Sequence, residues 1–161
     1  MPSLSNERIV YHNGRYVPES QALVPFRDRS FTYGDGCFDM TRSFGHRIFR
    51  LKEHLDRFAR SLRYLGIDPG MSMAEMASIS EEVFERNRHL LGPDDDYWLG
   101  QRVSRGVRRV PGDNWDQTGP TVIIECMPLP LAERAASYRD GIRVIVPSVR
   151  RTAPDALSPR A

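Results

Sequence analysis

The sequence predicts a mixed α/β fold of the α+β type, with a small N-terminal α/β domain followed by the start of a larger second domain. Extended apolar segments bounded by turn residues gather in two stretches, residues 9–49 and 97–126, as is typical of strands. Residues 51–65 and 72–84, which lie between these stretches, carry apolar side chains at helical spacing. The chain has 161 residues, of which 40% are hydrophobic and 27% charged, a composition typical of globular domains.

The N-terminal segment predicts a β-hairpin. Ile9–His12 and Arg15–Val17 flank Asn13 and Gly14, a pair that favours a type I′ turn because both residues tolerate positive φ. Residues 22–26 are expected to form a short strand or an extended segment.

A turn-rich loop is expected over residues 28–36, followed by a strand over residues 37–44. Gly45 and His46 turn this strand back into residues 47–49. The first helix comes next, and Gly66 is placed to end it. Its apolar positions recur at three- and four-residue steps: Leu51, Leu55, Phe58, Leu62 and Leu65.

The second helix is expected to start at Ser72, because Glu75 three residues later completes a capping box. A strand is expected over residues 97–105, then a loop through Gly119, then a buried strand over residues 121–126. The apolar face of the second helix is expected to consist of Met76, Ile79, Val83 and Phe84.

These elements divide the chain into three parts. Residues 1–127 are expected to form the N-terminal α/β domain, residues 128–136 an interdomain linker that begins with a Pro-Leu-Pro sequence, and residues 137–161 the start of a C-terminal domain. Residues 142–146 open this second unit as a strand without a later partner. We therefore expect the protein to continue beyond Ala161.

Composition excludes several classes of function. The 23 basic residues nearly balance the 21 acidic ones, so a net charge of +2 requires no nucleic-acid partner. No apolar run approaches about 18 residues, so no membrane span is expected. Cys37 and Cys126 form neither a disulfide framework nor a zinc site. Together with an N-terminal segment that lacks an apolar signal sequence, this predicts a cytoplasmic protein without a metal.

The residues alone define no complete catalytic constellation. The four histidines fall on separate elements, and the sequence contains no Walker motif, no nucleophile elbow and no HExxH motif. Arg57 lies off the apolar stripe of its helix, where it is either a solvated arginine or a ligand for an anion.

Three segments together resemble a known family. They are residues 28–38 (DRSFTYGDGCF), residues 49–58 (FRLKEHLDRF) and residues 149–161 (VRRTAPDALSPRA). In this order they resemble the class IV, fold-type IV pyridoxal-phosphate enzymes. This family includes branched-chain and D-amino-acid aminotransferases, (R)-amine transaminases and aminodeoxychorismate lyase. The resemblance implies pyridoxal 5'-phosphate as cofactor and a homodimer in which a loop of one subunit, here residues 105–119, completes the site of the other.

The resemblance also implies roles for individual residues. Arg57 matches the arginine that holds the cofactor phosphate, and Tyr33 and Phe38 fall where the family lines its substrate pocket. Arg42 matches an arginine of the branched-chain pattern. Strand alternation would place Phe38, Met40 and Arg42 on one face. The alternative is a core aromatic side chain and a surface arginine.

The segment after residue 96 gives a mixed signal about the branch. Tyr97 matches a strand tyrosine that branched-chain enzymes direct at the substrate carboxylate, but Leu99 stands where they carry an arginine. The Ser-Arg-Gly sequence centred on Arg105 resembles the D-amino-acid, (R)-amine and lyase branches, which adds Arg105 to the expected pocket.

The family's reaction needs a lysine that bonds the cofactor as a Schiff base, and the resemblance places this lysine immediately after Ala161. Lys52, the one lysine of the sequence, matches no catalytic position. We expect an aminotransferase that moves an amino group between an amino acid or primary amine and a 2-oxo acid. The alternatives are a lyase that cleaves aminodeoxychorismate and, for a chain that ended at Ala161, a non-catalytic α/β remnant.

Overall fold

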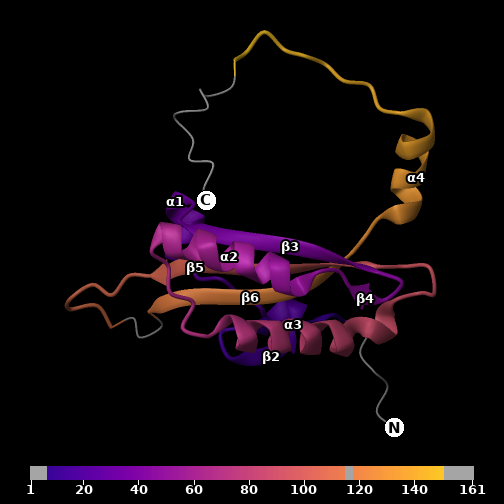
Figure 1. Ribbon diagram of the computed structural model, residues 1–161. Coiled ribbons are helices and arrows are strands. Elements are labelled where there is room, and N and C mark those ends of the chain that lie inside the picture. Colours follow the sequence, from indigo (N-terminus) through magenta and orange to yellow (C-terminus); the bar gives the residue numbers. More distant parts are fainter. Residues whose placement is uncertain (1–6, 115–117, 151–161) are drawn as a thin grey trace.

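The computed structural model of the protein describes residues 7–114 and 118–150, which form a mixed α/β structure around one antiparallel sheet (Figure 1). This arrangement confirms the predicted fold class. The strand order is β2-β1-β6-β5-β3-β4, and every neighbouring pair is antiparallel. The strands are β1 Ile9–His12, β2 Arg15–Pro18, β3 Gly36–Phe44, β4 Arg47–Ile48, β5 Tyr97–Val107 and β6 Gly119–Pro128.

The N-terminal hairpin is confirmed, and the segment after it differs from the prediction. Asn13 and Gly14 turn the chain with φ values of 45° and 89°. A 3₁₀ helix, η1 Glu19–Gln21, follows, and residues 22–25 form no regular secondary structure and do not join the sheet. The loop predicted over residues 28–36 was wrong in part, because Arg29–Tyr33 forms a short helix, α1. The Asp28 carboxylate starts this helix by accepting the Ser30 backbone N–H.

Two long helices cover one face of the sheet. They are α2 Leu51–Leu65 and α3 Met73–Asn87, and η2 Arg88–Leu90 continues α3. The predicted capping box of Ser72 and Glu75 is present, and Gly66 ends α2 in the left-handed conformation as expected. Figure 1 shows α2 along β3, and α3 packs on β6 and β1. The core between the helices and the sheet includes Tyr11, Leu55, Phe58, Leu62, Met76, Val83, Phe84, Tyr97, Leu99, Val103, Val122, Ile124 and Cys126.

The last described segment leaves the sheet domain. Helix α4 spans Leu131–Asp140, and the exposed chain after it is extended. Residues 142–146, predicted as a strand, pair with no strand among the described residues. The proposed division at residues 127 and 136 stays a prediction. Residues 151–161, part of the third motif, lie outside the described residues.

Candidate functional site

Strand alternation sorts the predicted site residues onto two faces of the sheet. Phe38 pairs with Arg102 on β5, and Arg42 pairs with Trp98. These side chains lie on the face opposite α2 and α3, where the Phe38 side chain is 64% exposed. Phe38 and Arg42 therefore lie on one face, as strand alternation predicted. Residues 98, 100 and 102 of β5 lie beside them on the same face.

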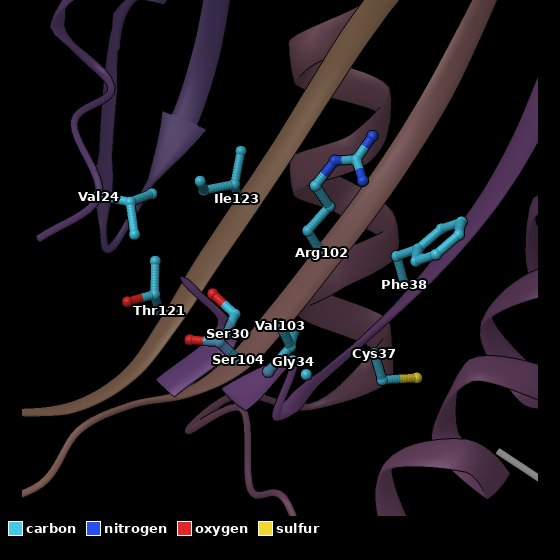
Figure 2. A pocket seen from close by; sticks show the side chains of 11 residues that line it. Val24, Ser30, Gly34, Cys37, Phe38, Arg102, Val103, Ser104, Thr121 and Ile123 are labelled. Carbon is cyan, nitrogen blue, oxygen red and sulfur yellow. The ribbon is translucent and has the colours of Figure 1, made fainter. Parts of the chain in front are cut away.

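A cavity of about 390 Å³ opens on this face between the start of β3, the middle of β5 and β6 (Figure 2). Among the described residues that line this cavity, only Arg102 has a charged side chain. The other lining side chains are apolar, carry hydroxyls or carry a thiol: Val24, Phe38, Val103 and Ile123; Ser30, Ser104 and Thr121; and Cys37. The cavity thus combines an apolar lining with a cation and a row of hydroxyls.

One buried carboxylate organises the hydroxyl side of the cavity. Asp28 is fully buried, and its Oδ2 accepts hydrogen bonds from Ser104 Oγ at 2.9 Å and Thr121 Oγ1 at 2.6 Å. Its Oδ1 accepts from the backbone N–H and hydroxyl of Ser30. Burial acts to raise the pKa of Asp28, but these hydrogen bonds outweigh it and hold the pKa below its usual value. Asp28 is therefore an anion that joins α1 to β5 and β6.

A second buried carboxylate lies on the helix side of β3, next to Phe38 in sequence. Asp39 accepts hydrogen bonds from Arg57 Nε at 2.7 Å and Nη2 at 2.8 Å, and its Oδ1 lies 2.7 Å from His54 Nδ1. Burial acts to raise the pKa of Asp39, but the bonds from Arg57 and His54 outweigh it and lower the pKa overall. The bidentate pair fixes the plane of the Arg57 guanidinium.

The geometry of Arg57 fits a phosphate ligand. Its side chain is 58% exposed, and Nη1 has no hydrogen-bond partner within residues 7–114 and 118–150. The hydrogen bonds with Asp39 raise the pKa of Arg57, so it stays charged. β4 pairs only with Ser43 and Phe44, so no described strand covers the edge of β3 beside Asp39. Arg57 lies on the helix side of this open edge, and Phe38 lies on the other side of the same strand.

Arg105 lies outside the cavity and binds other parts of the protein. Its Nε donates to Asp35 Oδ2, and Nη1 and Nη2 donate to the Gly66 and Leu65 carbonyls at the end of α2. A cation at this helix end also interacts favourably with the helix dipole. Arg105 thus fixes α2 against the start of β3.

Tyr97 and Tyr33 are also separate from the cavity lining. Tyr97 is 1% exposed on the helix side, where its ring packs edge-on against Phe84 and its hydroxyl donates to the Asn87 carbonyl. Tyr33 ends α1 with 78% of its side chain exposed, and the Arg29 guanidinium lies 5.7 Å from its ring centre. The structure therefore brings Phe38 to the cavity, Arg42 to the same face and Arg57 to the nearby strand edge.

Three residues of this arrangement, Asp39, His54 and Arg102, were not predicted from the sequence. Asp39 directly follows the predicted Phe38, and His54 lies one helical turn before the predicted Arg57. The available signal was the carboxylate of Asp39 at a strand position that faces the helices. Arg102 could have been found by counting alternate positions along β5 from Ser104, which lines the same cavity.

The described residues hold neither a candidate metal site nor a membrane-spanning helix. Within residues 7–114 and 118–150, no group of three or more His, Cys, Asp or Glu side chains could hold a metal ion. In the same ranges, no helix has the length and apolar character needed to cross a membrane.

The described α+β domain thus combines an arginine fixed by a buried carboxylate on the helix side of β3 with an amphipathic cavity on the opposite face of the sheet. Residues 36–161 match the model of the class IV aminotransferase family, described as "Amino-transferase class IV". The chain belongs to this family, and its fold class is fold-type IV.

Relatives and solved structures agree with this assignment. The chain is 35% identical over 152 residues to a putative branched-chain-amino-acid aminotransferase of Methanocaldococcus jannaschii, covering 93% of this chain and 49% of that protein. It is 32% identical over 79 residues to a D-alanine aminotransferase of Staphylococcus aureus, covering 49% of this chain and 28% of that protein. The chain thus spans about half the length, or less, of these curated relatives. The branched-chain aminotransferase of Escherichia coli has the same fold, with a TM-score of 0.77 at 20% identity over 94% of this chain and 50% of that one.

Proposed function

We propose that the protein is a pyridoxal-phosphate-dependent aminotransferase that moves an amino group between an amino acid or primary amine and a 2-oxo acid. The observation that carries this proposal is the Arg57–Asp39 pair, which holds a guanidinium with an unbonded Nη1 at the edge of β3 in a chain of this family. The related D-alanine and branched-chain enzymes leave the preferred substrate open.

In this proposal the chain's residues bind and orient, and the cofactor, when bound, supplies an electron sink for the carbanion formed at the substrate Cα. Arg57 binds the phosphate through Nη1 while Asp39 keeps its Nε and Nη2 in place. Phe38 forms an apolar wall of the pocket, and Arg42 lies further along the same face. The Arg42 guanidinium already bonds the Ser43 carbonyl through Nε and lies near Asp96.

Lys52 does not provide the amine that bonds the cofactor. Its side chain is 84% exposed on α2, and Nζ donates to Asp56 at 2.7 Å. We therefore propose that the cofactor-bonding lysine lies outside the printed sequence.

The protein is further proposed to act as a cytoplasmic homodimer. The support for a subunit contact is a run of large apolar side chains that stay exposed between the first hairpin and β3: Leu23, Phe26, Phe31 and Tyr33, each more than 70% exposed. Size-exclusion chromatography with light scattering on the protein expressed from its complete gene tests this point. A monomer at micromolar concentration would contradict it.

The test of the cofactor site is Arg57→Ala, with Arg60→Ala as the matched control. Arg60 is an exposed arginine of the same helix with no recorded partner in the described structure. Loss of charge-assisted hydrogen bonds worth about 1.5–3 kcal/mol should raise the Kd for pyridoxal phosphate about 10- to 150-fold. Arg60→Ala should leave it within about twofold. The Kd is measured from the absorbance of the bound cofactor, and equal Kd values for both variants would contradict the assigned role.

A further inference from the structure

We infer that Arg102 is the residue that recognises the carboxylate of the substrate. The inference rests on the proposed function and deepens it, because it names the side chain that selects amino acids and 2-oxo acids over uncharged amines. Neither the family motifs nor the relatives' names assign a role to this position.

Arg102 occupies the centre of the open face. It pairs with Phe38 on β3 and with Ile123 on β6, so its neighbours across both strands line the same cavity. Its side chain is 42% exposed, and Cζ lies 5.4 Å from the centre of the Phe38 ring. Figure 2 shows Arg102 and Phe38 side by side above the hydroxyl-bearing part of the pocket. An arginine against an aromatic face is held in place without losing its donors.

The contacts of Arg102 leave a fork of donors for a ligand. Its Nε donates to Glu125 Oε1 at 2.5 Å, which anchors one side of the guanidinium to β6. Nη1 and Nη2 have no hydrogen-bond partner within the described ranges 7–114 and 118–150. Two parallel N–H groups in one plane match the two oxygens of a carboxylate.

Two other arginines predicted from the sequence as site residues, Arg42 and Arg105, lack such a fork. Arg42 points to the end of its strand, where Nε donates to the Ser43 carbonyl, Nη2 lies 3.5 Å from Asp96 and Cζ lies 3.9 Å from the Phe44 ring centre. Arg105 uses Nε, Nη1 and Nη2 for contacts with the protein.

The opposite side of the pocket disfavours a carboxylate. The hydroxyls of Ser30, Ser104 and Thr121 all donate to Asp28, and Ser104 Oγ also accepts the Gly106 N–H, so only the remaining oxygen lone pairs are left for a ligand. Lone pairs backed by a buried anion repel a carboxylate and accept hydrogen bonds from donor groups. The two ends of the pocket therefore differ in charge, and only the end at Arg102 favours a carboxylate.

Direct binding of a carboxylate that cannot be transaminated tests this inference separately from catalysis. The probes are 4-methylpentanoate and its uncharged isostere 4-methylpentanamide, titrated calorimetrically into the holoenzyme expressed from the complete gene. The variants are Arg102→Gln and Arg102→Lys. Arg88→Gln is the control, because Arg88 is 48% exposed and pairs with Glu85 on the helix layer.

The wild type and Arg88→Gln should bind the carboxylate about 10- to 150-fold more tightly than the amide, as charge-assisted hydrogen bonds provide. Arg102→Gln should abolish this preference, and Arg102→Lys should restore part of it because the charge returns without the fork. A preference that survives in Arg102→Gln, or a wild type without one, would overturn the inference. A wild type that prefers the carboxylate but transfers no amino group would instead refute the proposed function alone.

Discussion

Asp28 should contribute more to stability than any surface ion pair of this protein. Replacing it with alanine removes the side-chain cap of α1, which is worth about 1 kcal/mol. It also leaves the buried hydroxyls of Ser104 and Thr121 without their acceptor, at about 1–3 kcal/mol each. Ser30 is exposed, and water can replace its lost bonds. Asp28→Ala should therefore lower the free energy of unfolding by about 3–7 kcal/mol in total.

Urea unfolding followed by tryptophan fluorescence measures this loss. Asp28→Asn keeps one oxygen and the shape of the side chain, so its loss should be smaller, about 1–3 kcal/mol. Asp56→Ala is the control, because it breaks only the exposed pair with Lys52 and should change stability by less than about 0.5 kcal/mol. A loss below about 1 kcal/mol for Asp28→Ala would refute the reasoning, since it would mean that the hydroxyls find other partners at little cost.

The pH dependence gives an independent check of the charge on Asp28. Its pKa is lower in the folded protein than in the unfolded chain, because the hydrogen bonds outweigh burial. The stabilisation is therefore complete above the unfolded value of about 3.9 and is lost as the pH falls through the lower folded value. The difference in stability between wild type and Asp28→Asn should be constant near neutral pH and shrink below about pH 4. A difference that grows on acidification would show that Asp28 folds in its protonated form.

Two further predictions concern the backbone and the thiols. Gly106 has a φ of 69°, and a Cβ there would lie 1.4 Å from the Gly119 carbonyl oxygen. Gly106→Ala should therefore cost more than about 3 kcal/mol in urea unfolding, whereas Gly112→Ala, with positive φ but open space, should cost about 1–2 kcal/mol; equal losses would contradict the clash. Burial raises the pKa of the Cys126 thiol to about 12, so iodoacetamide at pH 8 should modify at most Cys37 in the native protein and both cysteines in urea. Two adducts on the native protein by mass spectrometry would contradict this.

Elements with purely local signals could be predicted from the sequence. The Asn13-Gly14 turn, the capping box at Ser72 and the glycine that ends α2 each satisfy their backbone groups within a few residues. Helix α1 was missed although Asp28 caps it locally by accepting the Ser30 N–H. The other bonds that hold the Asp28 carboxylate come from Ser104 and Thr121, 76 and 93 residues away, and the nearby residues do not reveal these.

The face of the sheet on which a strand residue lies could be predicted only where a local motif showed which alternate positions of the strand face the pocket. Phe38 and Arg42 follow from alternation along β3. Tyr97 follows from a motif match, yet the register of β5 against β3 turns it into the core beside Phe84, and a shift of one residue exchanges the two faces of the whole strand. The same register brings Arg102 to the pocket. The parity of β5 relative to the core therefore decides this part of the site, and Arg102 can be placed once one residue of the same face, such as Ser104, is known.

The two buried carboxylates explain how a thin sheet positions the groups proposed to bind ligands on both of its sides. Asp28 orients the hydroxyls at the pocket, and Asp39 fixes Arg57 on the helix side of β3, so each acts through the side chains that it bonds. A buried carboxylate holds its donors more rigidly than an exposed one, because no water competes for its oxygens. The cost of burying two anions is offset because both are hydrogen-bonded several times. The rigidity of the proposed site therefore depends on two residues that lie behind the groups expected to meet the ligand. Substitutions at Asp28 and Asp39 should alter binding without removing a single expected ligand contact.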